Sequence, residues 1–269
     1  MKTDLTNLQK LYSDGYSLND LQKILGVHRS TLSGYLKESG IHVNYQEKSK
    51  NLNQNYFNQI DSEDRAYMLG FIFADGSINL DYNRLTIDLS IQDQDILVKF
   101  STILYGRNHV KVYTRNNRKY CKLDINSKTI CNQLLKYNLT ENKTFTAQYP
   151  EMIDRSLNKH FIRGLIDGDG CIYLPSNNRS SPLVALIATR AMNDTVSKIL
   201  DSVLNLKSYV CKVHGQDISI MSELRIKNYH RCKILLDWLY RNSSIHLDRK
   251  YNRYLTFLSR YDKLRDQNK

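Results

Sequence analysis

The sequence predicts an α+β protein in which two similar halves follow a small helical domain. A nine-residue pattern occurs twice, and each copy opens the same order of helix, two strands, helix, two strands and helix. The first copy runs from Met68 to Gly76 and the second from Ile162 to Gly170. We therefore expect two pseudo-symmetric αββαββα halves with the repeated helices as the seam between them.

Residues 1–42 are predicted to form three short helices, because apolar residues recur at helical spacing and glycines interrupt the runs. The third helix turns its polar side chains outward, and these candidate DNA contacts are Arg29, Ser30, Ser33 and Lys37. A helix, a glycine turn and a second helix with a polar face resemble a helix-turn-helix, whose second helix enters the major groove. A three-helix bundle used for protein contacts is the alternative.

Residues 43–60 are rich in Asn, Gln, Lys and Ser with only isolated aromatic residues. Such a composition buries too little apolar surface to fold alone. This segment is predicted to be an interdomain linker.

The first half is predicted to span residues 61–150 and the second 151–262, with a short tail at 263–269. After the first motif helix the expected elements are strands at 77–80 and 85–91, a helix at 93–104, strands at 110–115 and 120–125, and a helix at 127–137. After the second they are strands at 171–174 and 183–189, a helix at 193–204, strands at 209–214 and 223–227, and a helix at 229–241.

Each motif helix carries small residues four positions apart, which are Gly70 with Ala74 and Gly164 with Gly168. Positions i and i+4 share one helix face, so the two helices are expected to pack almost backbone to backbone.

Each motif ends in an aspartate, Asp75 or Asp169, followed by a glycine that is expected to stop the helix in the left-handed conformation. A carboxylate at a helix C-terminus is disfavoured by the helix dipole. A divalent cation shared by the two acids is the expected compensation.

The formal net charge of +12 predicts a polyanionic partner, for which nucleic acid is the first candidate. No apolar run approaches the ~18 residues that a membrane span needs, and the N-terminus does not resemble a secretory signal. An intracellular protein, cytoplasmic or nucleoid-associated, is expected. The five cysteines form no Cys-x-x-Cys pair, so we expect neither a zinc cluster nor a disulfide framework.

Two predicted strands alternate polar with apolar residues, which places the polar set on an open sheet face. In each half that face is expected to be basic or polar and to enter the major groove, although an ordinary solvated face is the alternative. The candidate DNA contacts of the two halves are Lys111, Tyr113, Arg115, Arg190, Lys212, Glu223, Arg225 and Lys227.

Both repeated stretches resemble the LAGLIDADG motif of homing endonucleases, with Gly70 and Gly164 at the first glycine of the motif and Asp75 and Asp169 at its last acid. The resemblance implies paired saddle-shaped antiparallel sheets in a monomer that binds a long double-stranded DNA site. It also implies hydrolysis of both strands, leaving a staggered break, by an enzyme encoded in a mobile element.

Mg²⁺, with Mn²⁺ as a substitute, is the cofactor that the resemblance implies. Asp75 and Asp169 are the expected ligands, and the carbonyl oxygens of Ala74 and Gly168 are further candidates. The family also places a lysine after the third helix of each half, and Lys143 and Lys250 occupy these positions. Their expected role is to stabilise charge in the transition state or to lower the pKa of the attacking water.

A protein that binds DNA without cutting it, either a transcription regulator or an intron-splicing maturase on the same scaffold, is the alternative function. Two aspartates at unfavourable helix ends favour the enzyme, because a regulator has no need of them.

Overall fold

The computed structural model describes residues 5–14, 16, 18–41, 51–176 and 180–267. The chain divides between Leu52 and Asn53 into two compact units. No helix in the described ranges is long and apolar enough to cross a membrane.

The first unit contains helices α1 (Leu5–Ser13), α2 (Leu18–Leu25) and α3 (Arg29–Glu38), close to the predicted positions. Its core consists of four fully buried leucines, one from α1, one from α2 and two from α3, which are Leu8, Leu21, Leu32 and Leu36. Gly26 makes the turn between α2 and α3 with φ +65°, a conformation that favours glycine.

One side chain of α3 does not face the solvent as expected. Ser33 is only 4% exposed, because it lies one position after the buried Leu32 on the inner side of the helix, whereas Arg29, Ser30 and Lys37 are exposed. The prediction of Ser33 as a DNA contact is therefore wrong.

The predicted linker is shorter in the structure than its composition suggests. Residues 43–50 lie outside the described part, but the segment after Leu52 packs onto the second unit, where Phe57 is fully buried. The Phe57 backbone N–H donates to Gln133 Oε1 over 3.2 Å, and Gln133 Nε2 donates to the carbonyl of Gln54 over 3.0 Å. Tyr56 and Ile60 are buried as well, so isolated apolar residues among polar neighbours anchor this segment where a tertiary surface receives them.

The first half of the second unit confirms the predicted element order. Its elements are α4 (Glu63–Asp75), β1 (Gly76–Asn79), β2 (Arg84–Ser90), α5 (Gln94–Tyr105), β3 (Lys111–Arg115), β4 (Arg118–Asn126) and α6 (Lys128–Leu135). The strands form an antiparallel sheet in the order β1-β2-β4-β3. Asn116 and Asn117 join β3 to β4 with positive φ angles of 50° and 59°, as a tight hairpin turn requires.

The second half repeats this topology. Its elements are α7 (Asn158–Asp169), β5 (Gly170–Tyr173), β6 (Leu183–Thr189), α8 (Arg190–Leu204), β7 (Tyr209–Lys212), β8 (Met221–Lys227) and α9 (Tyr229–Tyr240). The antiparallel strand order is β5-β6-β8-β7. Ser77 pairs with Thr86 in the first sheet as Cys171 pairs with Ala185 in the second, so positions of the two halves can be matched residue by residue.

A long final helix, α10 (Asp248–Gln267), was not predicted and includes most of the expected tail. Its buried stripe is narrow and consists of Lys250, Tyr254 and Phe257, at positions i, i+4 and i+7. A lysine at the first of these positions hides the helical pattern, since a charged residue is not expected in a buried stripe.

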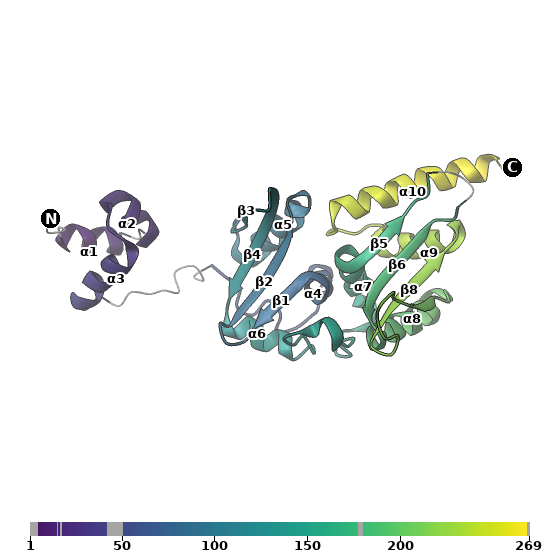
Figure 1. The fold of residues 1–269 in the computed structure, drawn as a ribbon, viewed down its shortest axis with the longest axis horizontal. Helices are drawn as coiled ribbons and strands as arrows, with labels where there is room; N and C mark the ends of the chain where they lie inside the picture. Colours follow the sequence, from purple (N-terminus) through teal and green to yellow (C-terminus); the bar gives the residue numbers. More distant parts are fainter. Residues whose placement is uncertain (1–4, 15, 17, 42–50, 177–179, 268–269) are drawn as a thin grey trace. The chain divides into compact units, whose positions relative to one another are not determined.

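Helices α4 and α7 lie side by side between the two sheets, and they form the seam between the halves (Figure 1). A Cβ atom on Gly70 would lie 2.0 Å from the carbonyl oxygen of Phe161, and one on Gly164 would lie 2.2 Å from that of Tyr67. A Cβ on Gly168 would lie 2.2 Å from the Cβ of Ala74. The close approach of the two backbones therefore depends on the absence of these side chains.

The glycines after the motif helices have a different role from the one predicted. Gly76 has φ −75° and ψ 149° and Gly170 has φ −83° and ψ 169°, so both are extended rather than left-handed. A Cβ on either glycine would lie 2.6 Å from the carbonyl oxygen four residues earlier, in Ile72 or Ile166. Glycine is needed because each strand leaves its helix directly, without a connecting loop.

Candidate active site

The two motif aspartates are the last residues of α4 and α7, so they lie at adjoining ends of the packed helices. A Cβ atom added to Gly168 would lie 2.9 Å from Asp75 Oδ2. The Asp75 carboxylate therefore lies against the end of the opposite helix, α7. Burial and, after it, the negative charge of Asp169 raise the pKa of Asp75 to about 6. The site thus brings together two acids that repel each other.

Asp169 lines a cavity of about 150 Å³ together with Ala74, Lys143 and Ile187. Partial removal from water raises the pKa of Asp169, while the charges of Lys143 and Lys250 oppose this rise. Both carboxylates therefore carry unfavourable charge that the two lysines do not fully compensate.

Lys250 lies at the start of α10 and is only 3% exposed. Its ammonium group donates to three backbone carbonyls, with Nζ 3.1 Å from the oxygen of Gly168, 2.7 Å from that of Gly170, and in contact with that of Ile166. Burial lowers the pKa of Lys250 to about 8, and the charge of Asp167 opposes this shift.

Lys143 begins the short 3-10 helix η3 (Lys143–Phe145) and is partly exposed. Its Nζ donates to the carbonyl of Ala74 over 2.8 Å. Burial lowers its pKa, while Asp169 and Asp75 oppose the change. Each lysine thus contacts the carbonyl that directly precedes its motif aspartate, Ala74 in α4 and Gly168 in α7.

The donor set at the helix ends consists only of oxygen atoms, which are the ligands that Mg²⁺ prefers. Among the residues described, no group of three or more His, Cys, Asp or Glu side chains is arranged to hold a metal ion. Two carboxylates fit an ion that keeps several waters or binds substrate oxygens. The carbonyls of Ala74 and Gly168 already accept a lysine hydrogen bond each, which leaves one lone pair on each for a further ligand.

Asp167 lies two residues before Asp169 but points into the core. It accepts hydrogen bonds from Tyr67 Oη over 2.7 Å, from Tyr240 Oη over 2.5 Å and from the Leu247 backbone N–H over 2.8 Å. Burial raises its pKa, and these donors oppose the rise. Asp167 is therefore a structural carboxylate that ties α7 to α4, to α9 and to the residue before α10.

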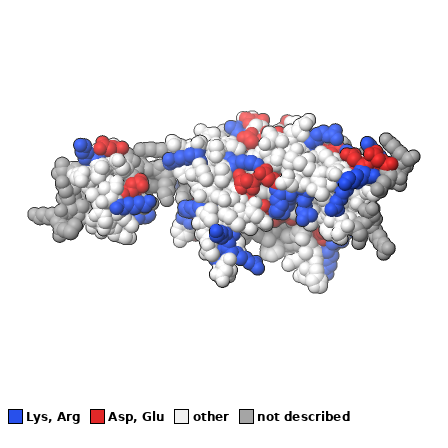
Figure 2. Space-filling model, turned by 90° about the horizontal axis from the view of Figure 1, so that it is seen from above, with Lys and Arg blue, Asp and Glu red and all other residues white. Residues whose placement is uncertain are grey.

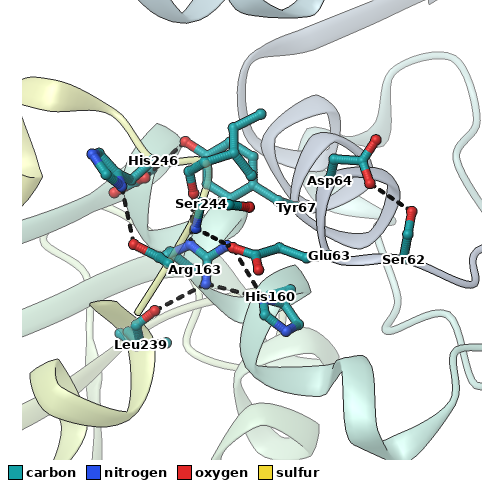
Figure 3. A network of polar contacts seen from close by, with 12 residues as sticks. Ser62, Glu63, Asp64, Tyr67, His160, Arg163, Leu239, Ser244 and His246 are labelled. Atoms are coloured by element: carbon teal, nitrogen blue, oxygen red, sulfur yellow. Dashed lines mark hydrogen bonds and ion pairs between the residues drawn. The ribbon is translucent and has the colours of Figure 1, made fainter. Parts of the chain in front are cut away.

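A second polar network, which the sequence did not reveal, crosses the seam at Arg163 (Figure 3). Arg163 is fully buried and donates from Nη2 to Glu63 Oε1 over 2.7 Å, and Glu63 also accepts from the backbone of Ser244 over 2.8 Å. Burial lowers the pKa of His160 beside this pair to about 4, so this imidazole is neutral at neutral pH. An arginine within the apolar run of the second motif was the available signal.

The first turn of α10 also contacts the first half directly. Arg249 makes a bidentate ion pair with Asp93, with Nε and Nη2 2.9 and 3.0 Å from the two carboxylate oxygens. The preceding Asp248 pairs with Lys99 of α5 over 2.7 Å. These two residues directly precede Lys250, and their ion pairs hold the start of α10 against the first half.

The open face of the first sheet is polar, as expected. Lys111, Tyr113 and Arg115 share it with residues of β2 and β4, since Lys111 pairs with Lys122 and Tyr113 with Tyr120. Lys111 and Lys122 both form ion pairs with Asp124, at 3.4 and 3.2 Å.

The open face of the second sheet differs from the prediction. Its charged residues all lie on β8 and are Glu223, Arg225 and Lys227, and Arg225 is tied to Glu223 over 2.6 Å. The other strands contribute mainly apolar residues to this face. The prediction rested on β8, the strand of this sheet in which charged and apolar residues alternate, and it did not hold for the neighbouring strands.

Two further candidate DNA contacts lie outside the open sheet faces, and one of them, Arg190, lies just past a strand as expected. Lys212 pairs with the buried Ser222, so it occupies a position on the helix-covered side of the edge strand and not on the open face. Arg190 is the first residue of α8 and forms an ion pair with Asp194 over 2.7 Å.

Charged residues of both signs are spread over the face of the molecule shown in Figure 2.

No protein-family model and no curated protein matches the sequence. Solved structures match the fold. I-SmaMI bound to an uncleaved DNA target in the presence of calcium ions has a TM-score of 0.54 and 14% identity, over 78% of this chain and 93% of that chain. The LAGLIDADG homing endonuclease I-GzeII in complex with its DNA target has a TM-score of 0.52 and 12% identity, over 76% and 91%.

The LAGLIDADG homing endonuclease I-LtrWI bound to target DNA has a TM-score of 0.51 and 13% identity, over 80% of this chain and 92% of that chain. The chain is thus similar in fold to LAGLIDADG homing endonucleases, with two four-stranded antiparallel sheets on paired central helices.

Proposed function

We propose that this protein is a sequence-specific DNA endonuclease of the homing type, which hydrolyses one phosphodiester in each strand with Mg²⁺ as cofactor. The observation that carries the proposal is the position of Asp75 and Asp169 at adjoining helix ends, each beside a buried or partly buried lysine. The three DNA-bound structures of similar fold support the substrate class.

The two aspartates have the properties that a cation site needs. Their raised pKa values show that the protein alone does not neutralise their charge. A divalent cation bound there supplies Lewis-acid stabilisation of the charge that develops on the phosphate and makes an attacking water more acidic.

Lys143 and Lys250 orient the C-terminal ends of α4 and α7, which carry these acids. Their ammonium groups hold the carbonyls of Ala74 and Gly168 in place, which limits movement of the aspartates when a DNA backbone approaches. Their positive charge also lies where phosphate oxygens become more negative in the transition state. Because each half supplies one aspartate and one lysine, the pseudo-twofold arrangement addresses the two DNA strands, and we propose that the two cuts are staggered.

The test is incubation of the purified protein with a library of plasmids carrying random inserts, with Mg²⁺ or with EDTA. We expect Mg²⁺-dependent linearisation of a small subset of plasmids, and loss of cleavage by roughly 10³-fold or more in Asp75→Asn and Asp169→Asn. The control is binding of the recovered target by both variants, which shows that they remain folded. Specific binding by the wild type without any cleavage would overturn the enzyme and leave a DNA-binding regulator.

We further propose that the first unit extends the DNA contact through the exposed Arg29, Ser30 and Lys37 on α3. Deletion of residues 1–42 is expected to shorten the protected DNA footprint while cleavage persists. An unchanged footprint would contradict this role and favour a protein contact for these helices.

A further inference from the structure

The open faces of the two sheets differ in chemistry at positions that the strand register matches one to one. On β1 and β2 the first sheet presents polar side chains, which are Ser77, Asn79, Arg84, Thr86 and Asp88. The matched positions on β5 and β6 are Cys171, Tyr173, Leu183, Ala185 and Ile187. Every polar residue of the first face is thus replaced by an apolar or weakly polar one in the second, since a free cysteine behaves as a small hydrophobe.

This apolar surface is accessible. Ile187 is 43% exposed and Tyr173 is 48% exposed, whereas the inward residues of β6, Val184 and Leu186, are at most 2% exposed. Ala185, between them on the open face, is 5% exposed, so the accessible surface is that of the larger side chains. Tyr209 on the edge strand β7 extends the surface across the sheet, because it pairs with Arg225, which pairs in turn with Ala185. Such an exposed apolar set on a sheet face indicates a binding surface.

The position of the surface identifies its occupant. Strand β5 begins at Gly170, directly after Asp169, and Ile187 lines the same cavity as Asp169 and Lys143. A DNA duplex with its phosphate at Asp169 therefore extends along this face. A second copy of the chain seated here would cover Asp169 and block the site.

Within the major groove, the C5-methyl group of thymine is the apolar feature, and contact with it distinguishes a T·A pair from the other pairs. The first face offers hydrogen-bond donors and acceptors, whereas β5 and β6 offer methyl, methylene and ring surface.

We propose that the two halves recognise their half-sites by different chemistry, and that the second sheet selects thymine through contacts of Ile187 and Tyr173 with C5-methyl groups. This inference rests on the proposed DNA substrate. It assigns specificity-determining residues and does not depend on cleavage.

The experiment compares thymine with uracil, which lacks only the C5-methyl group. The full-length protein selects its target from randomised duplexes in EDTA, and the dissociation constant is measured by electrophoretic mobility shift. Deoxyuridine then replaces thymidine throughout one half of the target at a time. We expect roughly fourfold weaker binding for each methyl lost in the half-site of the second sheet, since burial of one CH₂-sized group contributes ~0.8 kcal/mol. In the other half-site we expect less than a twofold change in total.

Two variants assign the effect to the face. Ile187→Asp introduces the residue found at the matched position Asp88, and it is expected to remove the uracil effect at the base pair that β6 contacts. Ile187→Val keeps an apolar side chain and should retain the effect. Asp88→Asn is the matched control in the first half and should leave the thymine-to-uracil ratio unchanged. Circular dichroism melting verifies that all three are folded.

Each result decides the question. Equal uracil effects in both half-sites, no thymine enrichment in either, or an Ile187→Asp variant that keeps full discrimination would overturn the inference. A dimer that Ile187→Asp converts to a monomer would overturn it in favour of a second copy on this face. Specific binding with the uracil effect but without Mg²⁺-dependent cleavage would support it while overturning the proposed enzyme. Absence of any specific DNA binding would overturn both.

Discussion

The two halves of the second unit have the same strand order and register but hold their lysines in different ways. Lys143 stands in a short 3-10 helix, is partly exposed and contacts one motif carbonyl. Lys250 stands in a 20-residue helix, is 3% exposed and contacts three. In the half that contains α10, three hydrogen bonds fix the position of the lysine ammonium group, whereas in the other half a single hydrogen bond holds it.

The open faces differ in the same pair of halves, while the glycines of the seam do not. Gly70 and Gly164 are both in backbone contact with the opposite helix, so sterics require the same residue twice. Asp88 and Ile187 occupy matched positions without such a constraint, because an outward side chain affects the partner and not the fold. The close contact at the glycines therefore preserves the symmetry, and the faces and terminal segments break it.

The largest effect is expected where the halves are equal. Gly164→Ala places a Cβ 2.2 Å from the Tyr67 carbonyl oxygen, and Gly70→Ala places one 2.0 Å from that of Phe161. Each variant is expected to lower the free energy of unfolding by about 3 kcal/mol or more, since backbone atoms must move apart. Urea unfolding followed by the fluorescence of the single tryptophan, Trp238, measures this effect.

Gly34→Ala serves as the control for this pair, because nothing lies within 4 Å of its added Cβ. It should leave the Trp238 transition unchanged, since it lies in the other unit. A native-like unfolding curve for Gly164→Ala would contradict backbone-to-backbone packing at the seam.

The second prediction compares the lysines. Lys250→Met removes a donor from three carbonyls, of which that of Ile166 keeps the Gly170 N–H. The variant is expected to lower the free energy of unfolding by about 2 kcal/mol, because each of the two unpaired groups costs about 1 kcal/mol or more. Lys143→Met removes one partly exposed hydrogen bond and is expected to cost about 1 kcal/mol. Equal losses in urea unfolding would show that the two lysines are held alike.

The third prediction concerns the charge of Asp75. Its carboxyl has a pKa of about 6 in the folded protein and 3.8 as its ordinary value, so the folded state binds the proton more tightly. The contribution of Asp75 to stability therefore falls as pH rises from about 4 to 6 and stays lower above that range. Asp75→Asn is expected to raise the free energy of unfolding at pH 7 by about 1–3 kcal/mol and to change it little at pH 4. Thermal melting at both pH values, without metal, is the measurement, and a loss of stability at pH 7 would contradict the repulsion between the acids.

The smallest effect is expected in the pH dependence of the proposed cleavage. Protons and a divalent cation compete for Asp75, so the rate should decline as pH falls through about 6 at low Mg²⁺ concentration. A tenfold higher Mg²⁺ concentration should move this decline to lower pH by up to about one unit. Single-turnover cleavage of the selected target between pH 5 and 8 measures the shift. If the pH of the decline does not change with Mg²⁺ concentration, the titrating group lies outside the cation site.

The sequence by itself determined the elements that depend on local pattern. Strand alternation and helix periodicity located the helices and strands of both halves to within a few residues, α10 excepted, and the repeated motif identified the paired helices with Asp75 and Asp169 at their ends. These features could be predicted because spacing along the chain decides which residues share a face.

Only the tertiary structure decided the features that depend on what lies opposite a residue. The buried ion pair of Arg163 with Glu63, the core position of Asp167 and the carbonyl contacts of Lys250 each join segments far apart in the chain. The extended Gly76 and Gly170 and the apolar face of the second sheet likewise arise from neighbours that the local sequence does not contain. A charged residue is stable in such places because specific partners replace its water, and those partners become visible only when the chain is folded.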